Sequence, residues 1–196
     1  MRIIAGQLRG REVRAPRGSR VRPATGLVRE MAMSLLGDRL TAAPFLDLCA
    51  GTGLVGFEAL SRGAPCAVFV EADSRHAGQL RRTARELGVA ERSTVLKLDV
   101  RRCFRAIRKV LGSERPACAF LDPPFIEGMA EELLTCCGRE SAVLAPDGLL
   151  IVRAPGRLPV EVAGLRFRDH RRAGQSWLGV YQPAAPPDTG RRGAGR

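Results

Sequence analysis

The sequence predicts an α/β domain with a mostly parallel, seven-stranded sheet covered by helices on both faces, preceded by a small β-hairpin extension. From residue 45 onward, short apolar runs alternate with segments of helical periodicity, which is typical of parallel strands buried on both sides. Two further strand-like runs, 165–172 and 175–182, have no helix between them and predict an antiparallel pair that ends the sheet. At 196 residues the chain is long enough for one domain with a sizeable core.

The N-terminal residues 1–25 differ in composition from the rest. RIIAG and REVRAP are two short extended segments around a glycine-bearing turn, which predicts a hairpin. This stretch holds seven arginines and a single acid, Glu12. We therefore expect a basic extension at 1–25, a main domain at 26–182 and a disordered tail of proline, glycine and arginine at 183–196.

The elements of the main domain follow from apolar spacing. TGLVREMAMSLLGDRL predicts a first helix that ends near Gly37. The predicted parallel strands are PFLDLCA (44–50), CAVFVEA (66–72), STVLKLD (93–99), ACAFLD (117–122) and GLLIVRA (148–154). The helices between them are predicted at 54–61, 74–87, 101–111 and 127–137, and Ser74 is the expected cap of the second.

Charge and cysteine content limit the class of protein. The formal net charge of +12 would attract a polyanion such as nucleic acid, although an arginine surplus can also reflect a GC-rich genome. The six cysteines are scattered without a CxxC pair, so we expect reduced thiols rather than a disulfide or zinc framework. No run approaches the ~20 apolar residues of a membrane helix and no secretory signal is evident, so we expect a cytoplasmic protein.

The stretch LDLCAGTGLVG joins the first predicted strand to the next helix. Gly51 and Gly53 permit a tight turn and let a ligand approach the free amides at the helix N-terminus. Asp47, just before the turn, disfavours a pyrophosphate and favours a cationic or amine-bearing ligand. A tight turn that binds nothing is the alternative interpretation.

Two further acids end the second and third predicted strands. Glu71 lies 20 residues after Gly51, where an acid can accept hydrogen bonds from ribose hydroxyls. Asp99 could accept one from an adenine amino group, although strands also end in aspartate for turn formation. Together with Asp47 these acids predict a nucleoside ligand with no dominant phosphate.

The fourth predicted strand ends in Asp122-Pro123-Pro124-Phe125. The prolines stiffen the backbone, so that the Asp122 carboxylate and the Pro123 carbonyl could grip both hydrogens of an exocyclic amine. Phe125 could then stack on the base that carries the amine. The same tetrapeptide would also serve as a simple strand terminator.

These motifs resemble those of a known family. LDLCAGTG, VEAD, the LD at 98–99 and DPPF look like successive motifs of the class I S-adenosylmethionine-dependent methyltransferases that act on amines. The flanks RIIAGQLRGR, RPATGLVRE and AGQSWLGVYQ are similar, in order and spacing, to the RsmD-type enzymes. Those enzymes methylate the N2 amine of one guanine, of the guanine-966 type, in 16S ribosomal RNA. The resemblance runs from Arg2 to about Gln182.

The resemblance implies a Rossmann-like fold, S-adenosylmethionine as cofactor with S-adenosylhomocysteine as product, and no metal. The implied cofactor-binding residues are Asp47, Gly51, Gly53, Glu71 and Asp99. The implied catalytic residues are Asp122, Pro123, Pro124 and Phe125. The expected RNA contacts are Arg9, Arg11, Arg22 and Arg29.

The expected partner is 16S ribosomal RNA in the small subunit or its assembly intermediate, bound by a monomer without a membrane. Gly26 and Leu27 depart from the family, which has an acid and a basic residue at these positions. Two alternatives remain: an amino-methyltransferase on DNA adenine or another RNA, and a non-catalytic, basic RNA-binding assembly factor.

Overall fold

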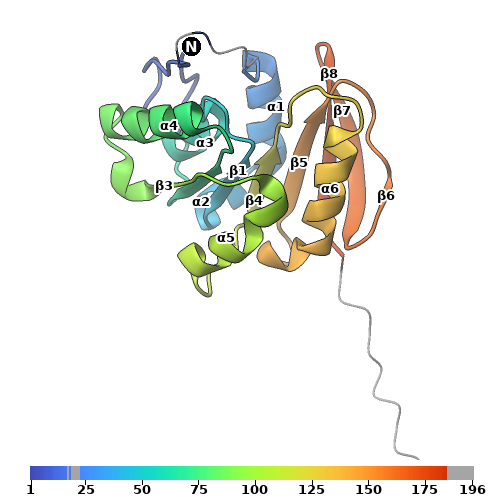
Figure 1. The fold of residues 1–196 in the computed structure, drawn as a ribbon. Coiled ribbons are helices and arrows are strands. Elements are labelled where there is room, and N and C mark those ends of the chain that lie inside the picture. The colour runs from blue at the N-terminus through green and yellow to red at the C-terminus, as the bar shows by residue number, and fades with distance from the viewer. Residues whose placement is uncertain (17, 19–22, 185–196) are drawn as a thin grey trace, which may run out of the picture.

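The computed structural model of the protein describes residues 1–16, 18 and 23–184, which fold around one mixed sheet (Figure 1). The strand order is β3-β2-β1-β4-β5-β8-β7-β6. The strands are β1 (Phe45–Leu48), β2 (Ala67–Val70), β3 (Ser93–Leu96), β4 (Cys118–Leu121), β5 (Leu149–Ala154), β6 (Glu161–Val162), β7 (Leu165–Ala173) and β8 (Ser176–Pro183). β1 to β5 are parallel, and β8, β7 and β6 continue the sheet antiparallel. The sheet therefore has eight strands rather than the predicted seven, because the two-residue β6 is too short to leave an apolar pattern.

Helices cover both faces of the sheet (Figure 1). The α-helices of the described residues are α1 (Gly26–Leu36), α2 (Arg39–Ala42), α3 (Leu54–Ser61), α4 (Ser74–Glu86), α5 (Phe104–Leu111) and α6 (Met129–Arg139). Alternate residues of β1 point into different cores: Phe45 packs with α1, α3 and α4, whereas Leu46 packs with α5 and α6. The predicted architecture of a parallel sheet between two helical layers is confirmed.

One helix cap and the starts of two other helices differ from their predicted positions. Asp73, not Ser74, caps α4, because its Oδ1 accepts hydrogen bonds from the backbone amides of Arg75 (2.9 Å) and His76 (3.0 Å). The helix predicted at 101–111 is divided into a 3₁₀ turn, Val100–Arg102, and α5. The helix predicted from 127 begins two residues later, after a glycine in left-handed conformation.

The N-terminal extension folds back on itself and enters the main core. It forms one isolated antiparallel bridge between Arg2 and Glu12, and the Val13 amide donates to the Met1 carbonyl over 2.7 Å. The side chains of Ile3 and Val13 are buried in the same core as α1 and α3. At the other end, β8 runs to Pro183, and residues 185–196 of the predicted tail lie outside the described residues.

The six cysteines are all free thiols. Burial raises the pKa of the Cys103 and Cys118 thiols to about 12. Among the described residues, no group of three or more histidine, cysteine or acidic side chains is placed to hold a metal ion. Nor does this part of the chain contain a helix long and apolar enough to cross a membrane.

A buried carboxylate joins the extension to the helices. Glu58 of α3 is fully buried, and its Oε2 accepts from Arg29 Nη1 of α1 over 2.8 Å and from the Ile4 amide over 2.9 Å. Its Oε1 accepts from the Ala5 amide and from Arg62 Nε, each over 3.0 Å. Because a buried charge is stable only when it is paired and hydrogen-bonded, this set fixes the extension, α1 and α3 relative to one another.

We expect Glu58→Gln to lower the free energy of unfolding by about 3 kcal/mol, because the buried Arg29 guanidinium loses its counter-charge. Denaturant unfolding followed by circular dichroism measures the difference. Glu132→Gln is the matched control, since Glu132 pairs with Arg101 on the surface and its loss should change little. Equal stability of the two variants would contradict this role of Glu58.

Candidate functional site

A cavity of about 730 Å³ lies at the carboxyl ends of the parallel strands. This is where the strand order reverses: β1 pairs with β2 on one side and with β4 on the other. The wall includes Asp47, Gly51, Glu71, Asp122, Phe125 and Arg153. Polar groups predicted from separate strands are thus brought together in one cavity.

The turn between β1 and α3 has an unusual backbone. Cys49, Gly51 and Gly53 have φ angles of 62°, 54° and 74°. A Cβ on Gly53 would lie 2.3 Å from Leu80 Cδ2 of α4, so only glycine fits there. Burial, together with the neighbouring acids, raises the pKa of the Cys49 thiol, whose residue also lines the cavity.

Asp47 holds the first turn of α3 through a hydrogen bond from a backbone amide of that helix. Its Oδ2 accepts from the Gly56 amide over 2.9 Å, and a Cβ on Gly56 would lie 2.3 Å from Phe69 Cε1. Burial raises the pKa of Asp47 well above its usual range, and the Gly56 hydrogen bond opposes this. Gly56, the third glycine of LDLCAGTGLVG, therefore permits close packing against Phe69 and the hydrogen bond to Asp47.

Glu71, the residue after strand β2, holds the same turn through a hydrogen bond. Its Oε2 accepts from the Gly51 amide over 2.7 Å, and its Oε1 accepts from the Asp73 amide over 2.8 Å. The 20-residue spacing noted in the sequence thus corresponds to a direct hydrogen bond. Each carboxylate oxygen has a second acceptor site, so Glu71, on the cavity wall, can accept two ligand hydroxyls as well.

Asp99 is not among the residues that line this cavity. Its Oδ1 accepts from the Arg101 amide over 2.8 Å, and its Oδ2 pairs with Arg101 Nη1 over 2.9 Å. The residues on either side of it, Leu98 and Val100, line the cavity instead. Asp99 thus caps a 3₁₀ turn, while the apolar side chains on either side of it face the cavity. The expected adenine contact of Asp99 stays a prediction.

The Asp122–Phe125 segment forms the opposite wall. The Asp122 amide donates to the Leu48 carbonyl over 3.2 Å, which holds the segment beside β1. No donor among the described residues reaches the Pro123 carbonyl. The Phe125 side chain is 46% exposed although it is aromatic. An acceptor carbonyl and an exposed ring thus lie beside a carboxylate on the cavity wall, and the expected grip on an amine stays a prediction.

Arg153 of β5 is a site residue that we did not predict. Its Nη1 lies 3.0 Å and 3.3 Å from the two Asp122 carboxylate oxygens, and its Cζ lies 4.9 Å from the Phe125 ring centroid. Its Nε donates to Ser176 Oγ over 3.1 Å. The sequence signal was an arginine inside the apolar run GLLIVRA, because a buried arginine needs a partner. That partner is identifiable only once β5 is known to lie beside β4.

Burial and the Arg153 guanidinium have opposite effects on the pKa of Asp122. Burial raises the pKa of Asp122 to about 6, and the charge and hydrogen bond of Arg153 act in the opposite direction. Arg153 therefore favours the ionised form of the Asp122 carboxylate against the effect of burial. A single nitrogen bridges both oxygens, so each oxygen still has an acceptor site for a ligand.

The arginines expected to contact RNA have different environments. Arg9 and Arg11 are exposed on the extension, and Arg11 Nη2 donates to the Glu86 carbonyl of α4. Arg29 is buried and pairs with Glu58, so the expectation of an RNA contact is corrected: its charge stabilises the core. Arg22 lies outside the described residues.

Comparison with known proteins agrees with this arrangement. A family model described as "Conserved hypothetical protein 95" matches residues 1–182. The chain is 30% identical over 184 residues to the "Putative rRNA methyltransferase YlbH" of Bacillus subtilis, covering 93% of this chain and 98% of the relative. It is 31% identical over 188 residues to the "Ribosomal RNA small subunit methyltransferase D" of Escherichia coli, covering 94% and 91%. The solved structure of the "Putative methyltransferase yhhF" of Escherichia coli superposes with a TM-score of 0.76 at 32% identity, covering 95% and 99%.

The Asp122 carboxyl should titrate near pH 6 in the folded protein. In Arg153→Met the midpoint should rise further, because the positive charge that favours the carboxylate is removed. Carbon-13 NMR of carboxyl-labelled aspartate measures both midpoints. Arg108→Met, which removes the surface partner of Glu140, should leave the Asp122 midpoint unchanged. An unshifted midpoint in Arg153→Met would show that the pair does not set this pKa.

Proposed function

Because the chain belongs to the RsmD-type methyltransferase family, we propose that it methylates the exocyclic N2 amine of a guanine in 16S ribosomal RNA. The target that fits the family is the guanine-966 position of the small subunit. One observation carries the proposal: the glycine turn clamped by Glu71 and the Asp122–Phe125 segment line the same cavity. A nucleoside cofactor and a base amine could therefore meet within it.

The cavity fits S-adenosylmethionine as the methyl donor. Its volume of about 730 Å³ is within the ~300–1,000 Å³ typical of small-molecule sites. Glu71 would accept the ribose hydroxyls, Gly51 would permit close approach, and Leu98 with Val100 would contact the adenine. When bound, this cofactor supplies an electrophilic methyl group on a sulfonium, and an acidic cavity suits that cation.

The Asp122–Phe125 segment would hold the target amine. The Asp122 carboxylate and the Pro123 carbonyl each accept one amine hydrogen, which directs the nitrogen lone pair toward the methyl group. Positive charge grows on that nitrogen during transfer, and the fixed carboxylate stabilises it. Phe125 stacks on the base, which has to leave its own stack to reach the cavity. The extra proton then leaves to water or to Asp122.

Arg153 would act as a positioning residue for this step. It keeps Asp122 ionised, so that the carboxylate can accept a hydrogen, and its guanidinium lies over the Phe125 ring. Ser176 holds the same guanidinium from β8. The proposed amine site thus depends on three adjacent strands, β4, β5 and β8.

We expect Asp122→Asn to lower kcat for methyl transfer by roughly 100-fold or more, because the charge that stabilises the developing cation is lost. Small ribosomal subunits that lack the modification and labelled S-adenosylmethionine provide the assay, and nuclease digestion with mass spectrometry identifies the methylated nucleoside. Asp147→Asn, an exposed residue far from the cavity wall, is the control and should retain the wild-type rate.

Three results would change the proposal. Full activity of Asp122→Asn would remove the catalytic role of that residue. Methyladenosine as product, or preference for duplex DNA over subunits, would indicate the other amino-methyltransferase activities. Absence of both transfer and S-adenosylmethionine binding in calorimetry would favour a non-catalytic RNA-binding factor.

Gly53→Ala should weaken S-adenosylmethionine binding about tenfold, because the added Cβ meets Leu80 and displaces the cofactor turn. Gly88→Ala is a matched control: Gly88 has the same φ of +74°, but no atom lies within 4 Å of its added Cβ. Both variants carry the same backbone strain, whereas only the first should change the dissociation constant measured by calorimetry. Equal affinities would exclude the turn as the cofactor site.

A further inference from the structure

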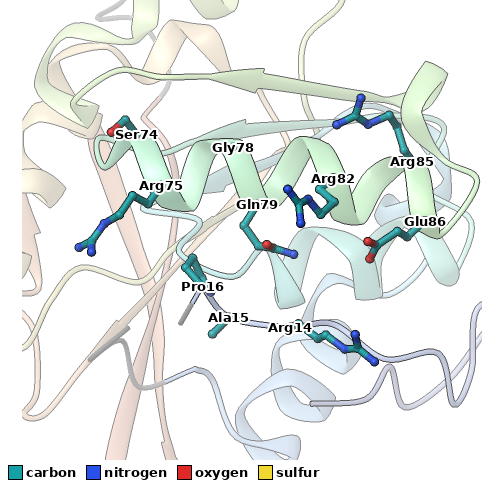
Figure 2. A pocket seen from close by; sticks show the side chains of 10 residues that line it. All are labelled: Arg14, Ala15, Pro16, Ser74, Arg75, Gly78, Gln79, Arg82, Arg85 and Glu86. Atoms are coloured by element: carbon teal, nitrogen blue, oxygen red, sulfur yellow. The ribbon is translucent and has the colours of Figure 1, made fainter. Parts of the chain in front are cut away.

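A second concavity, of about 630 Å³, lies between α4 and residues 14–16 of the extension (Figure 2). We call it the α4 groove. Its lining residues are Arg14, Ala15, Pro16, Ser74, Arg75, Gly78, Gln79, Arg82, Arg85 and Glu86. Figure 2 shows residues 14–16 running along the helix, with Gln79 and Glu86 directed toward them. None of the functions assigned above uses this groove.

The wall opposite α4 is held in place by the fold. Val13, directly before Arg14, is fully buried in the core. Arg11 donates from its guanidinium to the Glu86 carbonyl at the end of α4. These two contacts fix the chain on the N-terminal side of Arg14–Pro16 against the core and the end of α4.

The groove has an excess of positive charge. Four of its lining residues are arginines, and Glu86 is its only acid among the described residues. Arginines elsewhere, such as Arg101, Arg108 and Arg153, pair with carboxylates within 3.0 Å.

Ion pairing in the groove is uneven. Arg14 pairs with Glu12 over 2.9 Å, whereas Arg75 lies 3.8 Å from Asp73. Arg82 and Arg85 make no ion pair within the part of the chain that the structure describes. Among the described residues, these two groove arginines are therefore the ones open to an anionic ligand.

The surface of the groove allows a polymer to approach. Gly78 has no side chain, and a Cβ built there would meet nothing within 4 Å. Ala15 and Pro16 on the opposite wall carry no charge and no long side chain. Arg75 and Arg82 are seven residues apart on α4, about 10 Å along the helix axis, so that they can contact two different phosphates of one strand.

We infer that the α4 groove binds the phosphodiester backbone of the substrate RNA, beside the nucleotide that enters the main cavity. The inference rests on the proposed function and deepens it. The two cavities adjoin: Asp73 and His76 line the main cavity, whereas Ser74 and Arg75 line the groove. Arginine guanidinium groups suit phosphate because they donate in a planar fork. An RNA strand along α4 would thus reach the rim of the main cavity at Asp73 and His76, across the cavity from Asp122–Phe125.

The double variant Arg82→Ala/Arg85→Ala tests this inference. Filter binding should give a Kd for 16S ribosomal RNA about tenfold above that of wild type at low salt. The slope of log Kd against log salt concentration should fall by about 1 to 2, because two phosphate contacts are lost. Its kcat with saturating small subunits and its S-adenosylmethionine affinity by calorimetry should match wild type, which also reports that the cavity is intact.

Arg105→Ala/Lys109→Ala is the matched control, because it removes two exposed positive charges from one helix, α5, outside the groove. This control should keep the wild-type Kd within about twofold. Equal Kd and equal salt slope for the two double variants would overturn the groove as an RNA site, while methyl transfer by wild type would leave the proposed function standing. A wild-type protein that binds RNA with the expected dependence on Arg82 and Arg85 but transfers no methyl group would support the groove and refute the proposed function.

Discussion

The four hydrogen bonds on the Glu58 carboxylate determine how the functional surfaces are arranged. Glu58 belongs to α3, whose N-terminus carries the glycine turn, and its oxygens hold both α1 and the N-terminal extension. Through Pro23 and Ala24 the segment before α1 contributes to the main cavity, and through Arg14 the extension contributes to the α4 groove. The Glu58 carboxylate thus holds in place segments that line both the main cavity and the α4 groove. Arginine-rich terminal segments are often solvated, whereas this extension is held by hydrogen bonds to a buried carboxylate.

The protein stabilises its buried acids in three different ways, with different chemical results. Glu58 is neutralised by two arginines and serves only the fold. Asp47 accepts from a helix amide, and burial raises its pKa, so that its role is to hold the first turn of α3. Asp122 has one arginine partner and faces the cavity, which leaves an ionised carboxylate with free acceptor sites. Only the last arrangement is suited to bind an amine.

Local sequence was enough to predict the features that depend on neighbouring residues. The apolar runs gave β1 to β5, and the spacing of Gly51 and Glu71 indicated two groups that prove to be hydrogen-bonded. Features that depend on distant partners were missed or misplaced. Arg29 was expected to contact RNA because its buried partner, Glu58, lies 29 residues away in the sequence. The contact of Arg153 with Asp122 could be recognised only from the pairing of β5 with β4. The cap that Asp99 forms on a 3₁₀ turn was likewise not predicted, because the sequence does not show which side of a strand end faces the cavity.

The protonation state of the Cys49 thiol bears on whether this cysteine could compete with an amine for a methyl group. A thiolate next to an alkylating sulfonium would compete with any amine for the methyl group and would inactivate the enzyme by self-modification. Burial and the acids around the cavity, Glu71 and Asp122 among them, raise the pKa of this thiol, so it stays protonated and poorly nucleophilic. The same negative surroundings that suit the proposed cationic donor would therefore protect the protein from methylation by that donor. This cysteine is compatible with the site because of its electrostatic environment, even though the residue belongs to the cavity wall.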